Sequence, residues 1–458
     1  MKILFCIYQI DFADHIAISY LSAIAKKYGN TTFFCEFKDL EKKLSEVHPD
    51  IVAYSLNLLG FDEIVSTNKR LQKEYGYKVI AGGPHVTLNQ NLFPIDGIDA
   101  ACVGEGEGAF EDYIQCIQKS ESYERVQNLI TPTSRNPVRK LIVNLDEIPF
   151  PDRDLTIANT FLKDLPKKTF YSSRGCPYGC TYCGNSFIND LYRGNKIMRR
   201  FSPRRIIDEI KYVRDKYGLK FMKLGDEVFA LKADDWLREF THLYKEEVGI
   251  PWGAYLRFDT LNKDSLALLQ HAGMYSCTLS VDSTSEYVRE EILGRRQKRV
   301  DIEAQLRLIK EYNINTLVNF MLGAPGSTIE DDLQSIEMGR NGKVDFLPYT
   351  ITTPVKGTKL YDYSVEHGLV PPDYGDEVMV DIATNEFMWR SPYNSFTEKE
   401  KDIHMNIRNL GGLVSKMPDW IRWFGYFLIK HTPPNRFYAW SRRIERIYMM
   451  EYKIFKLH

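Results

Sequence analysis

The sequence predicts an α/β protein with two parallel sheets and a mostly helical C-terminal region. Short apolar runs alternate with amphipathic stretches over the first 118 residues, and the alternation resumes after residue 168. From about residue 375, aromatic and basic residues replace this pattern. Because 458 residues exceed what one hydrophobic core normally serves, we expect several domains.

Residues 1–120 predict a Rossmann-like, doubly wound parallel sheet. The run at 50–56 is continuously apolar, as a strand covered on both faces requires. Helical stretches separate it from similar runs, and such βα units form an open sheet that binds ligands beyond the carboxyl ends of its strands. The strand candidates are 2–8, 31–35, 50–56, 77–83 and 98–104.

A polar, proline-containing linker is predicted over 121–165, followed by a partial (β/α)6 barrel over 166–372. Six apolar runs alternate there with five helical stretches. In such barrels the chemistry lies at the C-terminal ends of the strands. The strand candidates are 168–173, 220–225, 252–258, 276–281, 315–322 and 345–351.

The C-terminal region, 373–458, predicts helices with an aromatic and basic surface. From Ser391 onward, 12 Lys and Arg residues stand against 6 Asp and Glu residues. The stretch 419–430 interleaves aromatic and basic residues, which suits either a cap packed on the barrel mouth or contact with a membrane surface or a lipid-like substrate. No apolar run is long enough to predict a transmembrane helix.

The charge balance and the cysteines limit the partners and the compartment. Sixty Lys and Arg residues against 61 Asp and Glu residues give no general electrostatic case for nucleic acid. We expect a cytoplasmic location, where the eight cysteines stay reduced. Structural disulfides are then not expected, and cysteines that bind a metal become the question.

The strongest motif is SSRGCPYGCTYCGNS, directly after the first predicted barrel strand. It carries Cys176, Cys180 and Cys183 at the spacing Cys-x3-Cys-x2-Cys. Structural zinc normally takes four ligands, whereas three thiolates leave a [4Fe-4S] cluster with one open iron. We expect Gly175 and Gly179 to let the loop wrap with its amides inward. Structural zinc and buried apolar cysteines are the alternatives.

The motif and its position resemble the radical S-adenosylmethionine (SAM) enzymes. In that family the open iron chelates SAM, and one electron cleaves it to methionine and a 5′-deoxyadenosyl radical that abstracts hydrogen. For Arg257 the alternative is a surface ion pair, and for the turn 323–326 it is a plain turn. The resemblance implies SAM contacts at Tyr182, Gly225, Asp226, Glu227, Arg257, Asp282, Gly323 and Pro325.

The segments HPDIVAYS, AGGPHVT and VGEGEGAF resemble the cobalamin-binding domain that precedes many radical SAM enzymes, and PFPDRDL is typical of that subgroup. The motif Asp-x-His-x-x-Gly, whose His ligates cobalt elsewhere, is absent. His85 is therefore either a cobalt ligand or a loop hydrogen-bonding residue, and a vestigial domain is the fallback. The resemblance implies cobalamin contacts at Ser55, Asn57, Gly82, Gly83, His85, Gly104, Glu105 and Gly106.

The combined resemblance is to class B, cobalamin-dependent radical SAM proteins. It implies methyl transfer to an unactivated carbon, or less often phosphorus, of a small-molecule or lipid-like substrate, with flavodoxin or ferredoxin as reductant. One alternative is a radical SAM oxidative cyclase or rearrangement enzyme without net methyl transfer. The other is a non-enzymatic cobalamin or redox sensor. The remaining cysteines, which we expect to be buried core thiols, are Cys6, Cys35, Cys102, Cys116 and Cys277.

Overall fold

The computed structural model describes residues 1–10, 14–57, 60–297, 300–371, 374 and 390–457. The chain forms two compact units. The N-terminal unit comprises 1–168 and 187–199, and the half-barrel unit comprises 169–186 and 200–458. Residues 187–199 belong to the N-terminal unit, whereas the sequence predicts that all of 166–372 belongs to the barrel. Residues 375–389 of the predicted C-terminal region lie outside the described residues.

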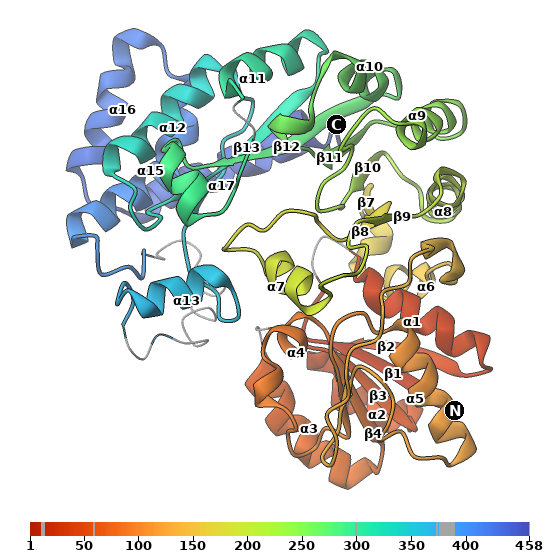
Figure 1. Ribbon diagram of the computed structural model, residues 1–458. Coiled ribbons are helices and arrows are strands. Elements are labelled where there is room, and N and C mark those ends of the chain that lie inside the picture. The colour runs from red at the N-terminus through yellow and green to blue at the C-terminus, as the bar shows by residue number, and fades with distance from the viewer. Residues whose placement is uncertain (11–13, 58–59, 298–299, 372–373, 375–389, 458) are drawn as a thin grey trace. The chain divides into compact units, whose positions relative to one another are not determined.

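The N-terminal unit contains the predicted doubly wound sheet, with strand order β2-β1-β3-β4-β5-β6 (Figure 1). Its first five strands are parallel, and β6, which was not predicted, pairs with β5 in the antiparallel sense. The elements are β1 (Lys2–Ile7), α1 (Ile16–Lys27), β2 (Thr31–Glu36), α2 (Leu40–Val47), β3 (Ile51–Ser55), α3 (Phe61–Tyr75), β4 (Lys78–Gly82), α4 (Pro84–Leu88), β5 (Ala100–Cys102), α5 (Glu107–Lys119), β6 (Leu129–Ile130) and α6 (Arg153–Ile157).

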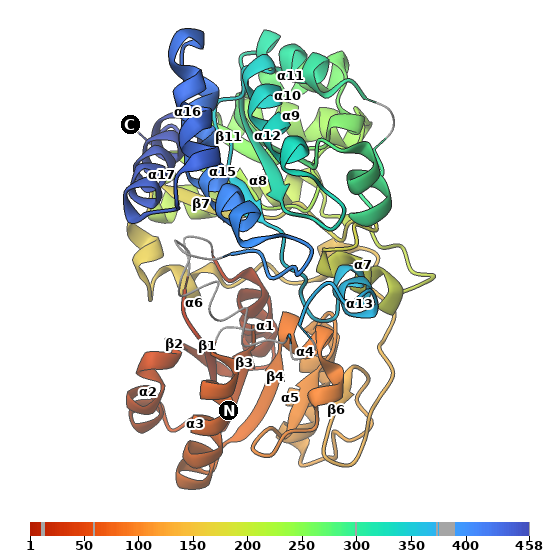
Figure 2. The same cartoon turned by 90° about the vertical axis from the view of Figure 1, so that its left-hand side faces the viewer.

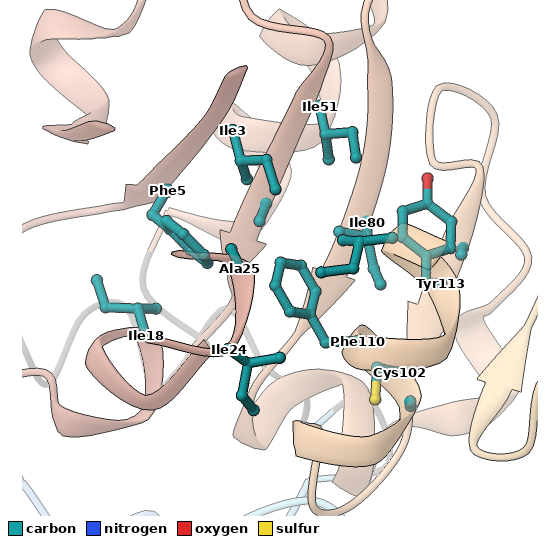
Figure 3. Packing of buried hydrophobic residues seen from close by; sticks show 14 of the residues in the cluster. Ile3, Phe5, Ile18, Ile24, Ala25, Ile51, Ile80, Cys102, Phe110 and Tyr113 are labelled. Carbon is teal, nitrogen blue, oxygen red and sulfur yellow. The ribbon is translucent and has the colours of Figure 1, made fainter. Parts of the chain in front are cut away.

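Alternate residues of each strand enter separate hydrophobic cores on the two faces of this sheet. On β1, Ile3 and Phe5 point to one core, and Leu4 and Cys6 point to the other. Figure 3 shows Phe5 beside Phe110 of α5, with ring centroids 5.8 Å apart. Burying a side chain of this size contributes about 1.5–3 kcal/mol. The continuous apolar runs follow from this two-sided burial.

The predicted linker is an integral part of the N-terminal unit. Leu155 and Leu162 enter the same core as Phe5, and α6 lies within this stretch. Arg153 is 1% exposed, and its Nη1 lies 2.6 Å from Asp14 Oδ2. The expectation of a linker was therefore wrong, because the sparse apolar residues between its prolines are buried.

The half-barrel unit confirms the predicted partial barrel, with strand order β14-β13-β12-β11-β10-β7. Helices α8 to α11 follow one another along the outer side of this sheet in Figure 1. Residues 187–191 of α7 and Arg199 of β9 belong to the N-terminal unit. Along this part of the chain the elements are β7 (Lys167–Phe170), β8 (Ser173–Arg174), α7 (Gly184–Leu191), β9 (Arg199–Arg200), α8 (Pro203–Tyr217), β10 (Phe221–Leu224), α9 (Asp235–Glu247), β11 (Trp252–Tyr255), α10 (Lys263–His271), β12 (Met274–Asp282), α11 (Ile302–Glu311), β13 (Asn315–Leu322), α12 (Ile329–Asn341), β14 (Tyr349–Ile351) and α13 (Lys359–Glu366).

The C-terminal region is helical, as predicted, and belongs to the half-barrel unit. Its helices are α15 (Glu398–Lys416), α16 (Asp419–His431) and α17 (Arg436–Tyr448). Helix α15 packs against α12 and β14, and α16 and α17 pack against α15 (Figure 2). Among the described residues, the model has no helix with the length and apolar character needed to cross a membrane.

Candidate functional site

The cysteine loop lies between β8 and α7 of the half-barrel unit, and its three thiols line one cavity of about 120 Å³. Cys180 is buried, whereas Cys176 and Cys183 are partly exposed. Burial raises the pKa of the Cys176 thiol to about 11. Within the described ranges, no three His, Cys, Asp or Glu side chains are grouped closely enough to hold a single metal ion.

Residues 292–294, which are more than 100 positions away in the sequence, hold the cysteine loop in place. The Thr181 amide donates to Leu293 O at 2.9 Å, and its hydroxyl donates to Ile292 O at 2.7 Å. Gly294 has φ +61°, and a Cβ there would lie 3.1 Å from Gly179 O. Gly175 has φ +83°, so its loop position favours glycine. Gly179 has no positive φ and open space around it, so the structure gives no steric reason for a glycine there.

The Asn185 amide donates to Cys183 Sγ at 3.6 Å. Such donors reduce the charge density on a thiolate that binds iron. Glu227 also lines the cavity, and burial raises the pKa of its carboxyl group. The loop therefore supplies three sulfur ligands with a polar donor and a carboxyl group beside them.

Tyr182 and Arg295 line the cavity and both contact the buried Asp282 behind them. The Tyr182 hydroxyl donates to Asp282 Oδ2 at 2.7 Å, and Arg295 Nε lies 2.9 Å from the same oxygen. Burial, followed by the Asp282 charge, raises the pKa of Tyr182. Asp282 has φ +70° where β12 shifts register against β13. Arg295 was missed by sequence reasoning, because it follows the fourth strand by 13 positions without a local motif.

Asp226 is turned away from the cavity. It is 1% exposed and accepts four hydrogen bonds from the backbone and hydroxyl groups of Ser172 and Ser173, at 2.6–2.9 Å. Burial raises its pKa to about 6, although these hydrogen bonds oppose the shift. The predicted strand 168–173 is divided into β7, which belongs to the six-stranded sheet, and β8, which pairs with β9 in a separate sheet. Gly225 is required because a Cβ there would lie 2.7 Å from the Tyr171 ring.

Arg257 lies two residues beyond β11 and is 2% exposed, so it is not a surface residue. Its Nε and Nη2 atoms lie 2.9 and 3.2 Å from the two carboxylate oxygens of Asp259. Its guanidinium also covers the Tyr178 ring, 3.5 Å from the centroid. The ion pair considered from sequence is present, but it is buried beside the cysteine loop.

His404 of the C-terminal region stabilises the turn after β13 through Asp332. The Gly323 amide donates to Asp332 Oδ2 at 2.9 Å, and His404 Nε2 of α15 lies 2.9 Å from the same oxygen. Gly323 has φ +63°, and a Cβ there would meet His404 at 2.9 Å. Pro325 is buried in this turn. Neither Gly323 nor Pro325 is among the residues that line the cysteine cavity. Sequence reasoning missed His404, which lies about 80 positions downstream.

In the N-terminal unit, the predicted contact residues lie at the carboxyl ends of β3, β4 and β5, which are neighbours in the sheet. Ser55 Oγ lies 3.3 Å from His15 Nε2, and Asn57 is exposed. Burial lowers the pKa of His15. His15 was not identified from the sequence as a residue of this edge. β1 and β3 are the strands between which the order reverses, so these residues lie where doubly wound sheets bind ligands.

The other predicted residues of this edge contact neighbouring residues of the N-terminal unit. Gly83 has φ +103°, and a Cβ there would lie 2.6 Å from Leu56 O, which explains the glycine; Gly82 ends β4. His85 is 4% exposed, and its ring lies 4.2 Å from the Phe61 ring. Asn89 Nδ2 lies 3.4 Å from His85 Nδ1, in keeping with the hydrogen-bonding alternative.

Segment 187–199 holds the loop after β5. The Glu105 amide donates to the Tyr192 hydroxyl at 2.9 Å, and Arg199 pairs with both Glu105 carboxylate oxygens. Gly104 has φ +78°, and a Cβ there would lie 1.9 Å from Tyr192 Oη. Gly106 precedes α5 as its N-cap. Tyr192 and Arg199 lie 87 and 94 positions from Glu105, so no local signal could reveal them.

The chain thus combines a half-barrel that carries a three-cysteine loop with a doubly wound sheet that has a glycine-rich edge. Residues 170–338 match the radical SAM superfamily, and residues 13–114 match the B12 binding domain. The chain therefore combines a radical SAM region with a B12-binding region. Its cofactors are a [4Fe-4S] cluster, SAM and cobalamin, and as a radical SAM enzyme it uses a substrate and a reductant.

The chain is similar to known proteins over most of its own length. It is 28% identical to an uncharacterised methyltransferase of Pyrococcus horikoshii, over 73% of each chain. It is 22% identical to the anaerobic magnesium-protoporphyrin IX monomethyl ester cyclase of Cereibacter sphaeroides, over 75% of this chain and 59% of the cyclase. The structure of TsrM, a radical SAM methyltransferase of Kitasatospora setae with cobalamin and a [4Fe-4S] cluster bound, aligns with a TM-score of 0.63 at 15% identity, over 80% of this chain and 78% of TsrM. The last similarity establishes the shared fold.

Proposed function

We propose that the enzyme is a cobalamin-dependent methyltransferase that acts on an unactivated carbon, or on phosphorus, of a small-molecule or lipid-like substrate. The observation that carries the proposal is the single cavity lined by three cysteines at the strand ends of the half-barrel, in a chain with a B12-binding domain. The methyltransferase from Pyrococcus horikoshii supports it. When bound, the cluster supplies the electron that cleaves SAM, and cobalamin carries the methyl group.

In this proposal Cys176, Cys180 and Cys183 bind the cluster as thiolates. Burial raises the pKa of the Cys176 and Cys183 thiols, so cluster binding must displace their protons. Glu227 and Arg295 line the same cavity and offer one negative and one positive group to the amino acid part of SAM. Tyr182 and Arg257 line the same cavity, and Asp282 pairs with Arg295. Asp226 and Gly225 fix the corner between β7 and β8. Gly323 and Pro325 form the turn after β13 and do not line the cavity.

For cobalamin we propose the carboxyl edge of the N-terminal sheet. Ser55, Asn57, Gly82 and Gly83 offer small side chains and close backbone approach, which suits a large planar group. Gly104, Glu105 and Gly106 shape the adjoining loop through Tyr192 and Arg199. His85, packed on Phe61, supports the loop. We further propose flavodoxin or ferredoxin as the reductant and the cytoplasm as the compartment, where the cluster thiols stay reduced.

The test combines metal analysis with product analysis. The protein is reconstituted anaerobically with iron, sulfide and hydroxocobalamin, then given SAM and a reductant. We expect about four irons and one cobalt per chain, and 5′-deoxyadenosine together with S-adenosylhomocysteine. Cys180→Ala should lose iron and deoxyadenosine but keep cobalt, and Cys277→Ala, a buried thiol outside the cavity, is its control. Iron without cobalt would contradict methyl transfer, and cofactor binding without SAM cleavage would indicate a sensor.

The cyclase from Cereibacter sphaeroides supports a second candidate, an oxidative cyclisation or rearrangement without net methyl transfer. The same assay separates the two reactions. Methyl transfer yields S-adenosylhomocysteine in addition to deoxyadenosine, whereas a cyclisation or rearrangement yields deoxyadenosine alone.

A further inference from the structure

The outer side of α16 and α17 carries an unusual concentration of exposed apolar side chains. Of the 17 large hydrophobic residues exposed in the described part of the chain, nine lie between 420 and 448. We call these nine the aromatic surface: Trp420, Trp423, Phe424 and Phe427 on α16, and Phe437, Trp440, Ile444, Ile447 and Tyr448 on α17. Their exposed fractions run from 42% to 76%, so the packing of the half-barrel unit does not use them.

These side chains form one stripe on each helix, opposite the face that packs on the protein. On α16, Trp420, Trp423 and Phe427 recur at helical spacing, whereas Gly425 is buried. A Cβ at Gly425 would lie 2.7 Å from Val414 of α15, so that face is in close contact. The helix therefore has two apolar faces, and only one is covered by the protein.

Helix α17 has the same design. Tyr438 and Ala439 are buried, and Glu445 turns toward Lys416 of α15, with Oε1 and Nζ 3.5 Å apart. Trp440 and Ile447 lie on the exposed side, at 57% and 50%. Contiguous exposed apolar surface on a folded protein usually marks a contact with a partner or a membrane.

The charge around the aromatic surface decides which partner it fits. Residues 419–457 contain eight Lys and Arg against three Asp and Glu, in a chain whose net charge is −1. Lys430, Arg436, Arg443 and Lys453 are exposed. Of the acids, Asp419 pairs with Arg340 and Arg422, Glu445 is turned inward, and Glu451 is partly exposed. Two copies of so cationic a face would repel each other, whereas an anionic lipid surface complements it.

We propose that α16 and α17 form a peripheral membrane-binding surface for anionic bilayers, with the aromatic surface at headgroup depth and the cations against lipid phosphates. Trp and Tyr favour that depth, and Lys and Arg beside them add attraction to anionic lipid. Because α16 and α17 are short and carry charges, they lie along the interface. The proposal is independent of the methyl-transfer reaction.

The experiment is co-sedimentation of the full chain with vesicles of phosphatidylcholine alone or with about 30% phosphatidylglycerol. We expect binding to the anionic vesicles, at least tenfold weaker binding to the neutral ones, and release by salt. Trp423→Ser combined with Trp440→Ser should weaken binding by on the order of tenfold or more. Tyr212→Ser, which removes an exposed aromatic residue of α8, is the matched control and should leave binding unchanged.

Two further measurements keep the proposal testable. Arg436→Glu combined with Arg443→Glu should abolish the preference for anionic vesicles. Lipids brominated near the headgroup should quench the tryptophan fluorescence of the unaltered protein when it binds. Failure to bind anionic vesicles, equal binding to neutral ones, or dimerisation through this surface without vesicle binding would each overturn the proposal.

Discussion

The strand-end edges of the two sheets are built from different chemistry. In the half-barrel unit the edge carries charged side chains in buried pairs, such as Asp282 with Arg295 and Arg257 with Asp259. At the edge of the N-terminal sheet the corresponding positions are mostly glycine and serine. There, Glu105 is neutralised by Arg199.

This difference follows from what each edge is proposed to bind. A small charged ligand beside a metal cluster is recognised by side chains held in fixed positions, because charge-assisted hydrogen bonds depend on direction. A large planar cofactor needs backbone that it can approach closely, because side chains would obstruct it. Side-chain substitutions should therefore have the larger effects in the half-barrel unit. An added Cβ should do more damage in the loop after β5 than in the cysteine loop.

The largest effect is expected from Arg295→Met. Asp282 is 4% exposed and would lose its cation, and removing one partner of a buried ion pair costs about 3–5 kcal/mol. Trp236, Trp252, Trp420, Trp423 and Trp440 lie in the half-barrel unit, so tryptophan fluorescence in urea reports the stability of that unit. Arg307→Met, at an exposed pair with Glu303, is the control and should change stability by less than about 1 kcal/mol. Equal effects of the two variants would contradict the buried network.

Asp226 predicts a pH dependence confined to the half-barrel unit. Its pKa of about 6 in the folded state lies above the ordinary 3.8, so between these pH values the folded state holds more of its proton. Stability from this group is therefore present below about pH 4 and falls as the pH rises to about 6, by up to about 3 kcal/mol. The Asp226→Asn variant should lack this slope in urea titrations at pH 4.5 and 6.5. Asp215→Asn, an exposed carboxyl on α8, should keep it.

Much of the fold could be predicted because it depends on local patterns. The continuous apolar runs of β1 and β3 predict two-sided burial, and the cysteine spacing stands in one loop. The half-barrel and the helical C-terminal region followed from the same periodicity. The prediction of a linker over 121–165 failed because it depended on contacts between residues far apart in the sequence. Leu155 and Arg153 pack against residues near the start of the chain, and the prolines around them gave no sign of this.

The same limit applies to the sites. The three cysteines were found from spacing, and the structure places them around one cavity. Arg295, His404 and Tyr192 reach their partners over long separations, so a single sequence contains no periodicity that indicates them. For Asp226 the resemblance implies a SAM contact, whereas in the structure its carboxyl group accepts hydrogen bonds from Ser172 and Ser173 and does not line the cavity.

A pair of glycine substitutions tests the other half of the comparison. Gly104→Ala combines φ +78° with a Cβ 1.9 Å from Tyr192 Oη, so we expect a loss of about 2 kcal/mol in the N-terminal unit and weaker cobalamin retention. Gly179→Ala in the cysteine loop has no positive φ and no atom within 4 Å of the added Cβ, so it should leave stability and iron content unchanged. Bound cobalt after gel filtration and circular dichroism measure the two effects. If Gly179→Ala were the more damaging, the contrast between the edges would be wrong.

The smallest effect is expected from Tyr182→Phe, which tests how much the Tyr182 hydroxyl contributes to holding Asp282. The substitution removes the hydroxyl that donates to Asp282 at 2.7 Å but keeps the ring on the cavity wall. Arg295 still pairs with Asp282, so the carboxylate retains its cation and the loss should be about 1 kcal/mol. Tryptophan fluorescence in urea, with iron content measured on the same sample, checks this value. A loss as large as that of Arg295→Met would mean that the hydroxyl, rather than the guanidinium, holds Asp282 in place.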